Sequence, residues 1–341
     1  MKKLIILCFI SFLVACKSEK RDINISDSNI KTAIQRFDID FWNQDTKNLK
    51  KSMEILYNKH PQLLSLYTEQ ALAIGKWDSK ECQEILTNYF FPDSTIQMLY
   101  NDCLKLYENI DDLDDELTKA FQRANVLFPE KKIPKVAFHV SAGVNPNPLL
   151  YKDSLLSLSI DNYLGENYPL YQNAVYSYLC YNMRREKVVP DIITIWIAYN
   201  FSFSPQSGQL LEEMLYRGKI MYLLSVLLPD EKKENLMGYT PEQWQWCIKQ
   251  EKDMWMTVVE QKHLFSTEGL LITKYLNDAP FTPYFSQDSP GRCGVFIGWR
   301  IVESFMKNNT RQEFYRNTEF TCKLACDNRK MLIPCTGDNQ L

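Results

Sequence analysis

One stretch of periodic apolar residues, 207–230, constrains the fold more than any other part of the chain. Apolar and small side chains recur in it every three or four residues: Leu211, Met214, Leu215, Gly218, Met221, Tyr222 and Ser225. This spacing places them on one face of a helix. Ser207 is positioned to cap the first turn, and Pro229 is positioned to end the helix. We therefore expect a central helix that packs this face against the core.

The charges at the start of this helix suggest a zinc-peptidase helix without its ligands. Such a helix carries two histidines four residues apart, which bind the metal, and a glutamate that acts as the base. The best register here runs from Glu213 to Arg217, so both histidines and the base are missing. The three histidines of the chain, His60, His139 and His263, are too scattered to replace them. The sequence therefore predicts no metal and no cofactor.

The first 16 residues have the pattern of a bacterial lipoprotein signal. Lys2 and Lys3 precede an apolar run over residues 4–14, and Ala15 comes directly before Cys16. The run is shorter than the ~20 residues that a membrane-spanning helix needs. We therefore expect residues 1–15 to be a signal peptide and Cys16 to be acylated, with residues 16–27 as the lipidated N-terminus and tether. The alternative is an ordinary secreted protein with a chance cysteine.

The net charge and the lipoprotein signal limit the kinds of partner that the protein is expected to bind. Removing Lys2 and Lys3 from the 39 basic residues leaves 37 against 42 acidic residues, a net charge of −5. Nucleic acid needs clustered Lys and Arg and is therefore not expected as a partner. We expect attachment to a membrane of the cell envelope through the N-terminal lipid, with the inner and outer membranes both open, and contacts with other envelope proteins.

The rest of the chain predicts an α+β fold in which helices predominate. Residues 28–130 show helical periodicity as an N-terminal helical region, and residues 131–309 form a second region with a small sheet. Strands are expected at 135–142 and 154–161, the second half-buried because Leu and Ser alternate in it. Helices of the second region are expected at 170–186, 191–202, 207–230, 241–261 and 294–308. Residues 310–341 form an atypical tail.

Three local features leave alternatives open. The acidic run 111–116 is either the charged start of a helix or a calcium site. The turn that contains Tyr163, Tyr168 and Tyr171 is either a packing feature or a surface for a partner. The eight cysteines that remain after cleavage and lipidation are either free core thiols or disulfide partners. Separately, the glycines at 291, 294 and 298 indicate close backbone packing.

Five co-linear segments resemble the gliding-motility lipoprotein GldB of Bacteroidetes. They are residues 34–75, 157–171, 210–230, 238–255 and 279–306, and the resemblance extends from Cys16 to about Asn309. It implies an envelope lipoprotein associated with surface gliding and with the type IX secretion machinery. Gliding of the host does not follow, since homologues occur in non-gliding members. The tail does not look like the usual ending of the family.

The family in turn is similar to predicted zinc-dependent proteases, which implies a degenerate zincin-like metallopeptidase domain. On that resemblance Glu213, Arg217 and Glu251 occupy vestigial metal-site positions and meet as a charge cluster. The expected cleft residues are Glu212, Tyr216, Trp255 and Arg292. Two function classes follow: a non-catalytic scaffold or peptide-binding module, and an envelope hydrolase with an unrecognised site. We favour the first, because acid–base chemistry needs a positioned group with a nucleophile or metal.

Overall fold

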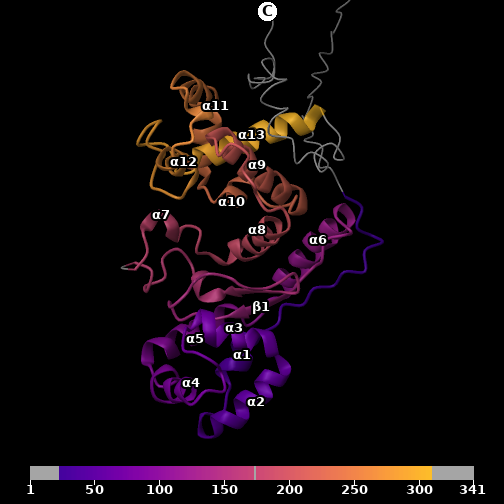
Figure 1. Cartoon of the computed structure of the whole chain (residues 1–341), viewed down its shortest axis with the longest axis vertical. Helices are drawn as coiled ribbons and strands as arrows, with labels where there is room; N and C mark the ends of the chain where they lie inside the picture. The colour runs from indigo at the N-terminus through magenta and orange to yellow at the C-terminus, as the bar shows by residue number, and fades with distance from the viewer. Residues whose placement is uncertain (1–22, 173, 309–341) are drawn as a thin grey trace, which may run out of the picture.

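The computed structural model describes residues 23–172 and 174–308 as an elongated arrangement of helices around a small sheet (Figure 1). The helices are α1 (Phe37–Trp42), α2 (Leu49–Lys59), α3 (Pro61–Leu66), α4 (Lys80–Ile85), α5 (Ser94–Leu106), α6 (Asp111–Leu127), α7 (Ser177–Cys180), α8 (Val188–Asn200), α9 (Leu210–Leu227), α10 (Lys233–Met237), α11 (Pro241–Glu260), α12 (Gly269–Leu276) and α13 (Cys293–Asn308). The strands are β1 (Lys135–His139), β2 (Leu149–Tyr151) and β3 (Leu155–Ser159). The prediction of a mainly helical α+β fold with a small sheet is confirmed.

The elements follow one another along the long axis of the molecule. Helices α1–α5 lie at one end, the sheet with α6 and α8 lies in the middle, and α9–α13 lie at the other end (Figure 1). One continuous cluster of buried apolar side chains runs through all three parts, from Ile34 to Met306. None of the helices in the described part of the chain is long and apolar enough to cross a membrane.

The sheet confirms both predicted strands and adds a third. β3 is central, parallel to β1 and antiparallel to β2, with Lys135 opposite Leu155. The prediction that the second strand is half-buried was wrong, because every residue of β3 is buried. Helix α8 packs on β3, while α1 packs on β1 and α3 on β2. The Ser157 hydroxyl, being buried, donates to the Ala137 carbonyl oxygen and lies 2.9 Å from His139 Nδ1.

Two segments with helical periodicity depart from the prediction. Residues 30–36 are extended, because α6 satisfies their backbone: the Ile34 amide donates to Asp114 and the Thr32 amide to Thr118. Of residues 170–186, only α7 and a short 3₁₀ turn are helical. There the Tyr171 hydroxyl donates to the Asp161 carbonyl oxygen, which fixes a compact turn instead of a helix.

The central helix is confirmed as α9, with one correction at its start. Ser207 does not cap it, since Gln209 is the residue before the first turn and its side chain makes no capping hydrogen bond. α9 crosses α13 at two glycines, Gly218 and Gly298. A Cβ on Gly298 would lie 2.0 Å from the carbonyl oxygen of Met214. The glycine-rich segment therefore serves close backbone packing, as predicted.

The cysteines within the described residues are free and buried: Cys82, Cys103, Cys180, Cys247 and Cys293. The alternative that the cysteines are free thiols in the core is confirmed for these five. Cys16, the signal peptide and the tail with its three cysteines lie outside the described residues, and so does most of the predicted tether.

Candidate functional site

The expected cleft residue Glu212 binds the backbone of the loop that precedes α9. Its carboxylate accepts hydrogen bonds from the backbone amides of Gln206, Ser207 and Gly208, at 2.7 to 3.0 Å, and from the Ser207 hydroxyl. Burial alone would raise its pKa, but these hydrogen bonds together hold the pKa below its ordinary value. Glu212 is therefore a buried anion whose hydrogen-bonding capacity is spent on the loop that enters α9.

Arg217 holds the end of a neighbouring helix. Its guanidinium donates to the carbonyl oxygen of Leu276, the last residue of α12, at 2.8 Å, and to the Asn277 side chain. Burial lowers the pKa of Arg217, with a further contribution from Arg292. Burial also raises the pKa of Glu213, which Arg217 partly offsets. No ion pair within the described ranges joins Arg217 to an acidic side chain.

Glu251 has a different cation as its partner. Both carboxylate oxygens of Glu251, on α11, lie 3.1 Å from Nε of Arg300 on α13, and Arg300 also binds Glu303. We expected Glu251 to meet Glu213 and Arg217 in a charge cluster, but its hydrogen-bond partner among the described residues is Arg300. The physical reason is that α13, packed between α9 and α11, supplies its own arginine to Glu251. The assignment of these positions as former metal ligands stays a prediction.

The remaining expected cleft residues also have separate partners. Tyr216 stacks on Phe203, with ring centroids 4.5 Å apart, and Trp255 is buried in the core. Arg292 has a left-handed backbone, φ 61°, and lies 3.6 Å from Asp278. Its guanidinium also donates to the Met237 carbonyl oxygen.

Potential metal ligands are likewise separated. The part of the chain that the structure describes contains no group of three or more His, Cys, Asp or Glu side chains that could hold a metal ion. In the acidic run, Asp111, Asp112 and Asp114 occupy the first turn of α6, as the helix-start alternative predicted. Asp112 pairs with Arg185 instead of facing its acidic neighbours.

The most concentrated polar site is one that the sequence analysis missed, at the end of α10. Lys187 is buried, and its ammonium donates to the carbonyl oxygens of Asn235 at 2.9 Å and Leu236 at 3.4 Å. Asp191 lies 3.7 Å away and accepts a hydrogen bond from Tyr163. Burial lowers the pKa of Lys187, and Asp191 opposes that shift. We call these five residues the α10 junction.

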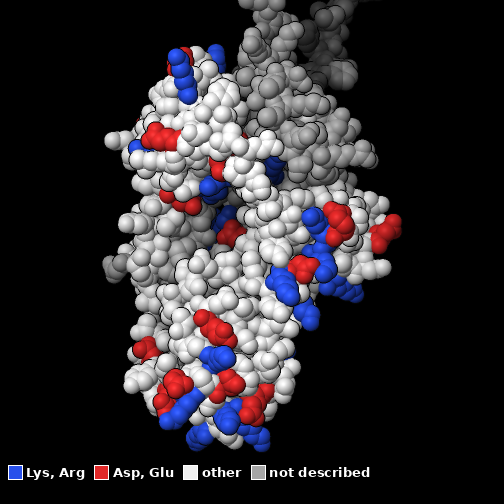
Figure 2. Space-filling model, viewed as in Figure 1, with Lys and Arg blue, Asp and Glu red and all other residues white. Residues whose placement is uncertain are grey.

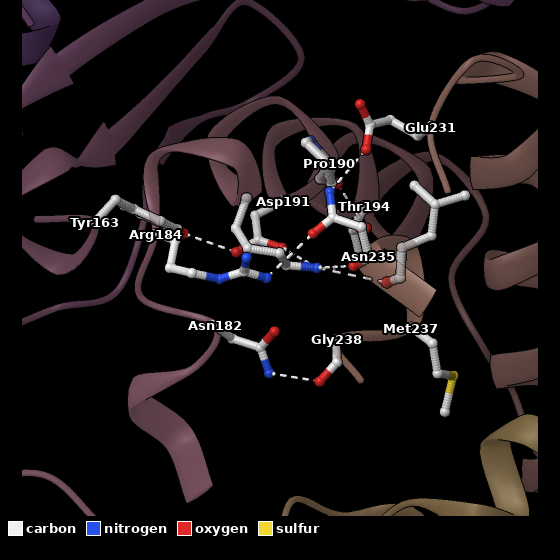
Figure 3. Close-up of polar contacts among 12 residues, drawn as sticks. Tyr163, Asn182, Arg184, Pro190, Asp191, Thr194, Glu231, Asn235, Met237 and Gly238 are labelled. Carbon is white, nitrogen blue, oxygen red and sulfur yellow. Dashed lines mark hydrogen bonds and ion pairs between the residues drawn. The ribbon is translucent and has the colours of Figure 1, made fainter. Parts of the chain in front are cut away.

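Figure 3 shows how this junction joins parts that are distant in sequence. Arg184 points to the Asn235 side chain, which in turn donates to Glu231, and Tyr163 points to Asp191. Asn182 donates to the Gly238 carbonyl oxygen on the other side. The junction therefore connects the turn after β3, the start of α8 and the end of α10. The i,i+4 spacing of Lys187 and Asp191 was the available sequence signal.

Lys187 is one case of a repeated arrangement. The last carbonyl groups of a helix have no partner within it and carry partial negative charge, so cations stabilise them. Buried or half-buried cations of this chain donate to such carbonyl oxygens in several places: Arg123 to Leu227, Arg217 to Leu276, Arg292 to Met237, Lys131 to Asn200. These cations therefore stabilise the ends of the helices whose carbonyl oxygens they bind.

The turn tyrosines resolve one open alternative. The hydroxyl groups of Tyr163, Tyr168 and Tyr171 donate to Asp191, Asp102 and the Asp161 carbonyl oxygen. These three tyrosines therefore serve packing, as one of the two alternatives predicted. On the face shown in Figure 2, Lys/Arg and Asp/Glu side chains are interspersed, most densely toward the end that carries α1–α5.

Comparison with known proteins identifies the family. No curated protein and no solved structure matches the chain. The similarity to zinc-dependent proteases therefore stays a prediction. The model of the family described as gliding motility protein GldB matches residues 18–319, which is most of the chain. The chain thus belongs to the GldB family of gliding motility lipoproteins.

Proposed function

We propose that this protein is a lipid-anchored, non-catalytic scaffold or protein-binding module of a gliding-motility and type IX secretion-associated envelope assembly. Family membership supports the setting. The observation that carries the scaffold role is the use of the charged side chains at the expected site. Glu212 clamps a loop, Arg217 holds the end of α12, and Glu251 binds Arg300.

Helix α11 offers a surface for a partner protein. Ile248, Met256 and Val259 lie on one face of it and are 41% to 44% exposed. Apolar side chains gathered on an exposed helix face are typical of protein–protein contact. The interspersed charges visible in Figure 2 suit a protein partner better than nucleic acid, which requires clustered cations.

The first experiment separates the scaffold from the hydrolase. Host cells that lack this chain are complemented with Glu213→Gln, and surface spreading and type IX secretion are measured. The Glu213 side chain makes no hydrogen bond or ion pair within the described ranges, so the Gln variant should fold normally and restore function to the wild-type level. Loss of function by a normally folded Glu213→Gln, or stoichiometric zinc in the purified protein, would instead favour the envelope hydrolase.

The second experiment tests the anchor. Cys16→Ser should leave an uncleaved precursor or a released protein, because a lipid at Cys16 is the proposed membrane attachment. Membrane and soluble fractions are compared by immunoblotting, with Cys82→Ser, a buried core thiol, as the control for the substitution itself. A mature Cys16→Ser protein that stays on washed membranes without any protein partner contradicts the anchor.

A further inference from the structure

The segment after β3 contains two sets of tyrosines whose hydroxyl groups differ in their hydrogen bonding. The inner set, in the turn described above, has every hydroxyl group bound to an acidic residue or a carbonyl oxygen. The outer set is Tyr176, Tyr178 and Tyr181, around α7, and its hydroxyl groups make no hydrogen bond to any described residue. Packing therefore accounts for the inner tyrosines and leaves the outer ones without a role.

The outer tyrosines form an aromatic surface at the edge of the molecule. Tyr176 is 72% exposed, and its ring stacks on Tyr178 with centroids 5.6 Å apart and planes 11° apart. The guanidinium of Arg184 lies 3.9 Å from the centre of the Tyr181 ring. Stacking on Tyr178 keeps the Tyr176 ring parallel to it, although most of the Tyr176 side chain is exposed to water.

A cavity of about 200 Å³ lies beside this surface. Three residues with polar side chains line it, Glu166, Asn167 and Ser177, and Ser177 stands between the two stacked tyrosines in the sequence. Tyr181 closes another side. A carboxylate accepts hydrogen bonds, while an amide and a hydroxyl both donate and accept. None of these three side chains is hydrogen-bonded to another described residue, so all remain available to a ligand.

Charges of both signs lie near the cavity, which disfavours a ligand of strong net charge. Glu166 would repel an anionic ligand, and Arg184, held over Tyr181, would repel a cationic one. A ligand with many hydroxyl groups on one edge and an apolar C–H face on the other would use both the polar lining and the aromatic surface.

We propose that this cavity and the tyrosines around it bind a neutral saccharide. A sugar ring lies against the exposed face of Tyr176, and its hydroxyl groups bind Glu166, Asn167 and Ser177. This gives the protein a glycan-binding site that is separate from the α10 junction and independent of the lipid anchor.

The test is calorimetric titration of the full-length protein with two neutral probes, a β-1,4-linked N-acetylglucosamine tetramer and cellotetraose. The protein is kept in lauryldimethylamine oxide, a detergent without a sugar headgroup. We expect saturable binding of at least one probe. Tyr176→Ala should weaken it roughly fivefold, since an aromatic contact of this kind contributes about 1 kcal/mol. Glu166→Gln should also weaken it, by removing the charged acceptor.

The matched control is Tyr89→Ala, because Tyr89 is also 72% exposed but follows α4, in the end of the molecule that carries α1–α5. It should bind the probes as the wild type does. Absence of saturable binding for both probes overturns the proposal, and so does an equal loss in Tyr89→Ala and Tyr176→Ala. Preferential binding of an oligolysine peptide at Tyr176 and Glu166 would overturn it in favour of a cationic protein ligand.

Discussion

Gly298→Ala tests the packing on which the C-terminal helices depend. At this position α13 lies against the backbone of α9, and an added Cβ would be 2.0 Å from the Met214 carbonyl oxygen and 2.6 Å from its carbonyl carbon. Ordinary van der Waals contact begins near 3.4 Å. The two helix backbones must therefore separate by more than an ångström, since no rotamer change can relieve a clash with main-chain atoms.

The size of the effect follows from two opposing contributions. Overpacking in a close-packed interior costs about 1–3 kcal/mol, and a clash with backbone belongs at the upper end of that range. Replacing glycine by alanine inside a helix offsets roughly 1 kcal/mol. We expect the free energy of unfolding to fall by about 2 kcal/mol, which lowers the melting temperature by roughly 3 °C for a chain of this size.

The assay is urea unfolding followed by circular dichroism, together with thermal melting. Gly269→Ala is the matched control, because Gly269 begins α12 and a Cβ there meets nothing within 4 Å. The control should be as stable as the wild type or slightly more so. Equal stability of Gly298→Ala and Gly269→Ala would refute the close backbone contact.

Two further predictions concern buried charge. Lys187→Met should lower the free energy of unfolding by about 3 kcal/mol, because Asp191 and two carbonyl oxygens lose their cation. Urea unfolding measures the change, with Lys249→Met on the exposed surface of α11 as the control. Equal stability of the two variants would contradict the α10 junction. Burial, with repulsion from Glu231 and Asp112, raises the pKa of Glu116 to about 7 from 4.5. Because the folded protein holds this proton more tightly, the destabilisation is absent below pH 4.5 and complete above about pH 7. Glu116→Gln should therefore raise the melting temperature at pH 8 but not at pH 4, while the exposed Glu69→Gln changes neither; a gain of equal size at both pH values would show that the charge is not the cause.

The sequence determined the elements whose signal is local. Apolar periodicity predicted α8, α9, α11 and α13 to within a few residues, since one buried face requires that spacing. Proline at the first helical position and Thr240 in a capping box fixed the start of α11. Co-linear motifs were enough to identify the family. The lack of two histidines four residues apart was also evident from the local sequence.

The tertiary structure decided what depends on contacts between distant segments. Residues 30–36 have helical periodicity, yet their amides bind α6 instead, because a long-range hydrogen bond competes with a local one. β3 alternates like a half-covered strand but is buried on both faces, since helices cover the sheet from two sides.

The charged site was decided in the same way. Four-residue spacing suggested that Glu213 and Arg217 would meet, and the family resemblance placed Glu251 with them. In the folded chain Arg217 binds the Leu276 carbonyl oxygen and Glu251 binds Arg300. The sequence could not match the cations that hold the ends of α9, α10 and α12 to their carbonyl acceptors, because donor and acceptor lie 48 to 104 residues apart. Helix ends require partners by the chemistry of the backbone, and only the folded chain determines which side chain supplies them.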